Sequence, residues 1–160
     1  KQIAATLSIS QSELLGINLE LDRPDPPVRS VPLISWVRAG NWSEAVDMFE
    51  PGDADQWIPV NVKTSPSAFA LTVVGDSMIS PYGATSYPPG TVIVVDPAGS
   101  PDPGRRVIAK HGDSGEVTFK ELAQDAGTSY LKPLNPQYPI ITVDGDWQVL
   151  GVVVSSIHNE

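Results

Sequence analysis

Residues 105–122 read RRVIAKHGDSGEVTFKEL, and this stretch decides the fold class. Two segments rich in apolar and β-branched residues, 105–111 and 116–122, lie on either side of the turn sequence Gly112–Gly115. This pattern is typical of two antiparallel strands joined by a short hairpin. The stretch therefore predicts β-structure.

The segments on both sides of this hairpin predict further short strands. The 160-residue chain holds 16 prolines and 13 glycines, a density that favours turns over long helices. One short helix is expected at Ser43–Phe49, where Ser43 can cap the first turn. We therefore predict an all-β domain of about eight or more short strands. Besides the hairpin, the expected strands are 69–74, 91–96, 130–134, 140–143 and 147–157.

The N-terminal region predicts a different organisation. Residues 1–16 place apolar residues at helical spacing, in a segment too short to bury its own apolar face. Residues 17–34 include the proline-rich run DRPDPP and predict an extended linker. We expect the folded β domain to occupy residues 35–160.

Composition narrows the function. The net charge is −9, so this part of the chain would repel the phosphates of nucleic acids and anionic membranes. The absence of cysteine excludes disulfides, thiolate zinc sites and a cysteine nucleophile, and two histidines are too few for a His-rich metal site. No apolar run is long enough to span a membrane, so we expect a cytoplasmic protein. We also expect the protein to need no cofactor and no metal.

Ser77 and Lys120 are the candidates for nucleophile and base. Ser77 follows an apolar strand and Gly75, a place where its hydroxyl can be exposed and its own N–H can face an oxyanion. Neither histidine has a position suited to a base, which leaves lysine. Taken alone, Ser77 is more simply a turn residue and Lys120 a solvated strand residue. The competing lysine, Lys110, ends a strand beside a turn and is expected to be solvated.

A series of motifs in fixed order resembles the LexA-type family of self-cleaving repressors, and lambdoid phage repressors most of all. Gly75–Met78 carries the serine, and Thr118–Lys120 carries a lysine 43 residues after it. Val37–Gly40 resembles the scissile Ala-Gly segment, with Gly40 lying 37 residues before Ser77. Tyr87–Gly90 and Tyr130–Pro139 resemble further family blocks. The resemblance covers about residues 31–158 and implies a β domain like those of LexA and signal peptidase.

The resemblance implies a role for each site residue. Ser77 would attack the carbonyl carbon of Ala39, in the same chain or in the dimer partner, and Lys120 would act as general base and pass the proton to the amine of Gly40. The N–H groups of Ser77 and of a neighbour such as Met78 would stabilise the oxyanion. This makes the chain a serine endopeptidase that acts once, on itself.

Two residues are implied to support this chemistry. Thr118 lies on the same strand face as Lys120 and could hydrogen-bond its amine. Val37 belongs to the cleaved segment, which is expected to be an extended substrate strand with small residues at the cut.

The resemblance also implies partners. Residues 1–16 resemble the end of a helix-turn-helix domain, so operator DNA would be bound through the missing N-terminal part. We expect a homodimer, with Val149–Ile157 as a candidate surface, and a RecA filament that favours the cleavable conformation. An antirepressor protein is a further expected partner.

Three other functions fit parts of the pattern. A repressor module could dimerise without any activity, since a fold does not imply its chemistry. A polymerase accessory subunit of the UmuD type shares the Ser/Lys pair. A signal peptidase does as well, but it needs a membrane anchor.

Overall fold

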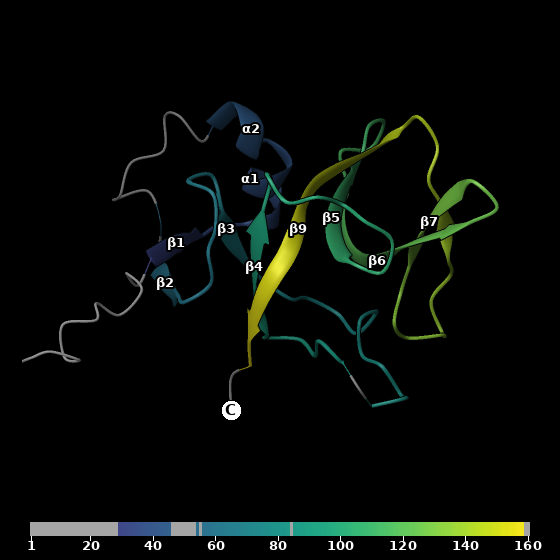
Figure 1. Ribbon diagram of the computed structural model, residues 1–160, viewed down its shortest axis with the longest axis horizontal. Coiled ribbons are helices and arrows are strands. Elements are labelled where there is room, and N and C mark those ends of the chain that lie inside the picture. Colours follow the sequence, from purple (N-terminus) through teal and green to yellow (C-terminus); the bar gives the residue numbers. More distant parts are fainter. Residues whose placement is uncertain (1–28, 46–53, 55, 84, 159–160) are drawn as a thin grey trace, which may run out of the picture.

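The computed structural model describes residues 29–45, 54, 56–83 and 85–158. Nine strands form one sheet in the order β2-β1-β3-β4-β9-β5-β6-β7-β8, and two short helices accompany them (Figure 1). The all-β prediction is thereby confirmed. The strands are β1 Arg29–Leu33, β2 Gln56–Val60, β3 Phe69–Thr72, β4 Val92–Asp96, β5 Arg106–His111, β6 Val117–Asp125, β7 Thr128–Lys132, β8 Ile141–Thr142 and β9 Trp147–Ile157, and the helices are α1 Trp36–Gly40 and α2 Trp42–Ala45.

The predicted hairpin is confirmed as β5 and β6, which pair antiparallel from Arg106 opposite Glu121 to Lys110 opposite Val117. Every neighbouring pair in the sheet is antiparallel except β1 and β3. The sheet begins at Arg29, inside the segment 17–34 that the sequence predicts as a linker. The expected N-terminal helix, the rest of that linker and the end of the expected helix at Ser43–Phe49 lie outside the described residues.

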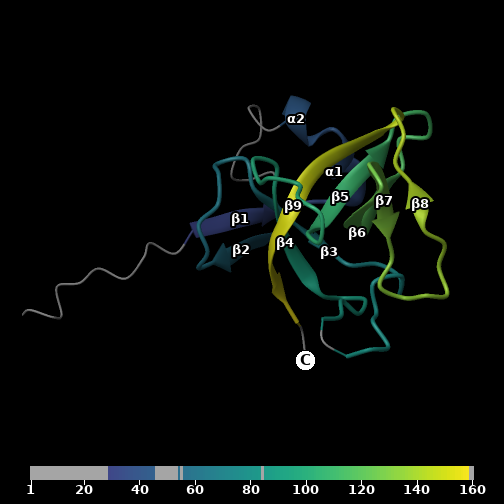
Figure 2. The ribbon, with the colours of Figure 1, turned by 45° about the vertical axis from the view of Figure 1, so that its right-hand side comes forward.

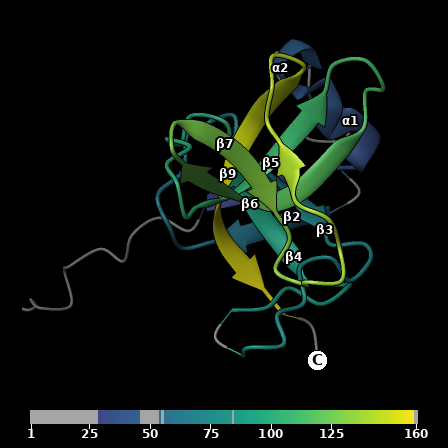
Figure 3. The same ribbon diagram turned by 90° about the vertical axis from the view of Figure 1, so that its right-hand side faces the viewer.

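The long strand β9 runs between β4 and β5 through the middle of the molecule (Figure 2). Its register shifts at Val94/Val95 against β4 and at Ile108/Ala109 against β5. Such bulges bend a strand and increase its twist. Accordingly β1 and β2 run across the direction of β9, while β7 and β8 form the end that faces the viewer in Figure 3.

Gly151 makes the crossing of β9 and β4 possible. A Cβ at this position would lie 2.6 Å from Cγ1 of Val95 and 3.1 Å from the carbonyl oxygen of Asp96. Because real carbon atoms do not approach so closely, only glycine lets the two backbones lie this near. The strand β9 pairs with β5 from Trp147 to Val152 and with β4 from Val152 to Ile157, so each edge of the predicted dimer strand Val149–Ile157 is paired over only part of its length.

The core lies on both faces of the central strands, which explains why their sequences are continuously apolar. In β3, Phe69 and Leu71 face one hydrophobic cluster and Ala70 faces another. In β4 the same alternation separates Ile93 from Val94. Each fully buried apolar side chain of this size stabilises the fold by about 1.5–3 kcal/mol. Within the described residues, no helix is long and apolar enough to cross a membrane.

The two helices correct the expectation of an extended segment at Val37–Gly40. This segment forms α1, because the Ser35 side chain accepts a hydrogen bond from the Arg38 N–H and caps the first turn. The side chains of Ala39 and Trp42 then join the cluster that contains Phe69. Helix formation and burial together hold this segment away from an extended conformation.

Candidate active site

Ser77 lies in a tight turn that follows β3. Gly75 has a φ of +79°, a conformation that side chains disfavour, and it reverses the chain before the serine. The Ile79 N–H donates to the carbonyl of Asp76 at 3.2 Å and closes the turn around Ser77 and Met78. Met78 is 1% exposed and anchors the turn in the hydrophobic cluster of β3 and β4.

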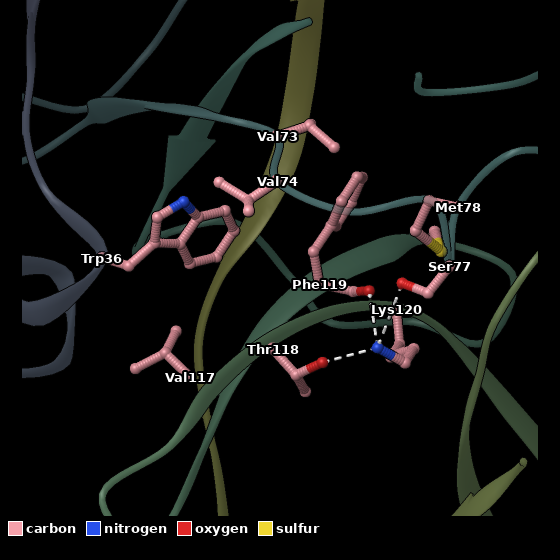
Figure 4. Close-up of a pocket in the computed structure, with 9 residues that line it drawn as sticks. All are labelled: Trp36, Val73, Val74, Ser77, Met78, Val117, Thr118, Phe119 and Lys120. Carbon is pink, nitrogen blue, oxygen red and sulfur yellow. Dashed lines mark hydrogen bonds between the residues drawn. The ribbon is translucent and has the colours of Figure 1, made fainter. Parts of the chain in front are cut away.

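Lys120 reaches this turn from the middle of β6. Its amine donates to the Thr118 hydroxyl at 2.6 Å and to the Phe119 carbonyl at 3.3 Å, and it lies 3.5 Å from Oγ of Ser77 (Figure 4). The contact with Thr118 is the one that strand alternation predicts. The structure therefore brings together Ser77, Lys120, Thr118 and, through its own turn, Met78.

Burial sets the electrostatics of Lys120. The residue is 9% exposed, and this desolvation lowers the pKa of its amine, while the Glu116 carboxylate acts in the opposite direction. A lysine with a lowered pKa is uncharged at a lower pH than usual. Its amine can then accept a proton, which is the property that a general base requires.

The pair opens onto a cavity of about 260 Å³. Ser77, Thr118 and Lys120 form a polar end, and Trp36 from α1 stands across the cavity from them (Figure 4). The Trp36 indole N–H donates to the Thr72 carbonyl at 2.8 Å, which holds the start of α1 at the cavity. The remaining lining residues are apolar: Val73, Val74, Met78, Val117 and Phe119.

The expected scissile residues do not line this cavity. Ala39 has no exposed surface and lines a different cavity, together with Trp42 and Phe69. Val37 is 80% exposed on the outside of α1. The cavity of Ser77 and Lys120 and the expected cleavage segment are thus neighbours through Trp36, but Ala39 and Gly40 do not line that cavity.

Lys110 corrects the expectation of a solvated lysine. Its amine donates to the Gly40 carbonyl at 2.9 Å, and its methylene groups pass close to Gly40. The hydrogen bond ties the end of α1 to β5. The sequence did not predict this contact, because it joins residues 70 positions apart and no local sequence pattern indicates it.

The two histidines lie elsewhere. Nδ1 of His158 lies 3.4 Å from the Thr91 hydroxyl, and neither histidine lines the cavity of Ser77. Among the described residues, a set that could hold a metal ion is His111, Asp113 and Asp146, whose ligand atoms lie within 4.8 Å of one another. None of these three residues lines the cavity, so this set is separate from the Ser/Lys pair.

Comparisons with known proteins identify the family of the chain. A family model described as Peptidase S24-like matches residues 32–154. The chain is 48% identical over 144 residues to the HTH-type transcriptional regulator for conjugative element SXT of Vibrio cholerae, covering 89% of this chain and 66% of the relative. It is 43% identical over 146 residues to Repressor protein C2 of Salmonella phage P22, covering 91% and 67%.

A more distant relative is a LexA repressor of Carboxydothermus hydrogenoformans, 29% identical over 147 residues, which make up 87% of this chain and 65% of that protein. The chain therefore spans about two thirds of the length of the curated relatives it matches. The matched region contains the end of β1, all of β2 to β8 and most of β9, together with Ser77 and Lys120. The chain therefore belongs to the Peptidase S24-like family, which it shares with phage-type and LexA repressors.

Proposed function

We propose that the chain is the self-cleaving part of a transcriptional repressor, which cuts its own Ala39–Gly40 bond with Ser77 and Lys120. The observation that carries the proposal is the buried Lys120 amine at 3.5 Å from Oγ of Ser77, in a cavity bordered by the cleavage helix. Active-site hydrogen bonds are often long before substrate docks, so this distance suits a resting pair.

The reaction proceeds in two steps. Oγ of Ser77 attacks the carbonyl carbon of Ala39, and neutral Lys120 takes the hydroxyl proton. The C–N bond to Gly40 breaks as Lys120 returns that proton to the departing amine. Water then hydrolyses the acyl ester, again with Lys120 as base, and releases the Ala39 carboxylate and the Ser77 hydroxyl.

Cleavage requires a second arrangement of the segment around Ala39. In the described conformation this residue is helical and buried, so α1 must unwind and release the Lys110 contact before the carbonyl can reach Ser77. A partner that binds the docked arrangement more tightly would shift this equilibrium. We infer that a RecA filament does so, with an antirepressor protein as the alternative inducer.

The rest of the repressor supplies the DNA contact. We propose that a helix-turn-helix domain, of which residues 1–16 are the end, precedes a linker and a cleavage domain that begins with β1 at Arg29. Homodimerisation through the β domain would pair two such DNA-binding parts on a two-fold operator. Cleavage at Ala39–Gly40 separates the DNA-binding part from the dimerising part and so relieves repression.

A module that dimerises without cleaving is the second candidate. The burial of Ala39 in a helix favours it, since a buried helical bond is protected from attack. The two functions differ in one measurable result, which is whether the purified chain breaks its own backbone.

The rate of self-cleavage is expected to rise with pH and then level off. Only neutral Lys120 acts as base, so below its pKa the rate should grow about tenfold per pH unit. Because burial lowers this pKa, the half-maximal rate should occur below the ordinary lysine value of about 10.4. Gel densitometry of samples incubated at a series of pH values measures this profile. A half-maximum at or above about 10.4, or a rate that does not change with pH, would contradict buried Lys120 as the base.

A further inference from the structure

The loop Asn135–Tyr138 contacts the Ser77 turn at three points. The Asn135 N–H donates to the Ser77 carbonyl at 3.0 Å, and its Nδ2 donates to the Asp76 carbonyl at 3.1 Å. The Tyr138 hydroxyl donates to the Asp76 carboxylate. This loop lies within Tyr130–Pro139, a block that resembles the LexA-type family but for which the sequence predicted no role.

The loop is itself held in shape. Oδ1 of Asn135 accepts the Gln137 N–H at 3.0 Å, and the Asn135 carbonyl accepts the Tyr138 N–H at 3.1 Å. Pro136 restricts φ at the first central position of this turn. The Asn135 side chain therefore uses its oxygen to stabilise its own loop and its amide nitrogen to bind the turn that carries Ser77.

These contacts fix the direction of two peptide planes. A trans peptide is planar, and its N–H points opposite to its carbonyl oxygen. With the Asp76 carbonyl directed at Asn135, the Ser77 N–H must point away from Asn135. The Ser77 carbonyl is fixed in the same way, so the Met78 N–H also points away from that loop.

Both of these amides lack a partner. Neither the Ser77 nor the Met78 N–H donates to any residue of the described ranges, although Met78 is 1% exposed and both residues line the cavity. Two successive free amides beside a nucleophile form the kind of concavity that binds an oxyanion.

We propose that Asn135, supported by Tyr138, is a positioning residue that holds the Ser77 turn so that its free amides face the oxyanion. This inference rests on the proposed self-cleavage. Asn135 itself does not contact the substrate, because its backbone N–H donates to the Ser77 carbonyl and its Nδ2 donates to the Asp76 carbonyl. Tyr138 restrains the same turn from the side of Asp76, whose hydrogen bond raises the pKa of the tyrosine hydroxyl and keeps it protonated as a donor.

Asn135→Asp tests this role in the full chain. Aspartate keeps an oxygen for the Gln137 N–H but loses the Nδ2 donor, so it spares the loop and leaves the Asp76 carbonyl with the Ile79 N–H as its remaining donor. Removing one oxyanion donor costs about 10²–10³-fold, so displacing such donors should lower the plateau rate of cleavage by about tenfold. The pH of the half-maximal rate should not move, because Lys120 is untouched.

A fluorophosphonate probe gives a second readout that does not need docking of α1. The Ser77 oxygen displaces fluoride from phosphorus through an oxyanion-like transition state, and intact mass spectrometry counts the labelled chains. Labelling of Asn135→Asp should slow by a factor similar to that for cleavage. Tyr138→Phe should slow both reactions a few-fold, and the matched control Tyr82→Phe, which removes another exposed hydroxyl beside this loop, should slow neither.

Wild-type rates of cleavage and labelling in Asn135→Asp would overturn the inference, and so would a rate loss accompanied by a shifted pH profile. If Asn135→Asp does not fold, the cleavage and labelling rates of Tyr138→Phe test the inference instead. This variant should fold, since it removes only one hydroxyl from an exposed side chain. A parent chain that reacts with the probe but cuts no bond would contradict self-cleavage, while the labelling rates would still test Asn135. A parent chain that does neither would overturn both proposals.

Discussion

Ser77→Ala is expected to abolish self-cleavage, with a loss of about four orders of magnitude or more, because no other group is placed to form the acyl ester. The fold should be unaffected, since within the described part of the chain the serine hydroxyl has one hydrogen-bond partner, Lys120 at the long distance of 3.5 Å. Thermal unfolding should therefore match that of the parent chain within about 0.5 kcal/mol. Cleavage is followed on denaturing gels over days at alkaline pH.

The matched control is Ser80→Ala. Ser80 lies three residues further along the same loop, and its hydroxyl accepts the Tyr82 N–H rather than contacting Lys120. The Ser80→Ala variant should cleave itself at the parental rate. Residual cleavage in Ser77→Ala at more than a few per cent of the parental rate would show that another nucleophile cuts the chain.

Lys120→Met has the second largest expected effect, a loss of about 10²–10⁴-fold, the usual contribution of a general base. Methionine retains much of the buried stem and removes the amine. Because burial disfavours the charged amine, this variant should be at least as stable as the parent chain at neutral pH. Between the lowered pKa of Lys120 and the ordinary value of about 10.4, the folded parent has lost a proton that its unfolded chain still binds. The parent therefore gains stability as pH rises through this range, and the stability difference between Lys120→Met and the parent should shrink.

Lys110→Ala distinguishes the two lysines. Loss of the hydrogen bond to the Gly40 carbonyl removes about 1 kcal/mol from the helical arrangement, which should accelerate cleavage about fivefold if the docked arrangement lacks this bond. Rate measurements on both variants under the same conditions test the assignment. An inactive Lys110→Ala together with an active Lys120→Met would mean that the base has been misassigned.

The sequence was sufficient to predict most strands of the sheet and the proximity of Ser77 to Lys120, but it did not predict β1 or β2. Alternating apolar residues and turn glycines identify strands such as β5 and β6, and alternation alone places Thr118 beside Lys120. The motif spacing then paired a serine and a lysine that no local rule could bring together. These features follow from hydrophobic periodicity or from resemblance to a family, and both can be recognised in a sequence alone.

The helix at Trp36–Gly40 was missed, although a signal for it was present. Ser35 is a good N-cap, and its side chain binds the Arg38 N–H. The segment has only five residues, so its conformation depends on burial of Ala39 and on Lys110 rather than on helix propensity. The role of Asn135 was unreadable for a similar reason, because its contacts with Asp76 and Ser77 exist only once distant loops are packed together.

The most direct test of self-cleavage at Ala39–Gly40 is the intact mass of the products after incubation of the purified chain at about pH 10, where the lowered pKa leaves more of Lys120 neutral than of an ordinary lysine. We expect two fragments, residues 1–39 and 40–160, that increase together and are absent from Ser77→Ala. Fragments that begin or end at any other bond, or an intact chain that remains folded and uncut at every pH, would contradict the assignment.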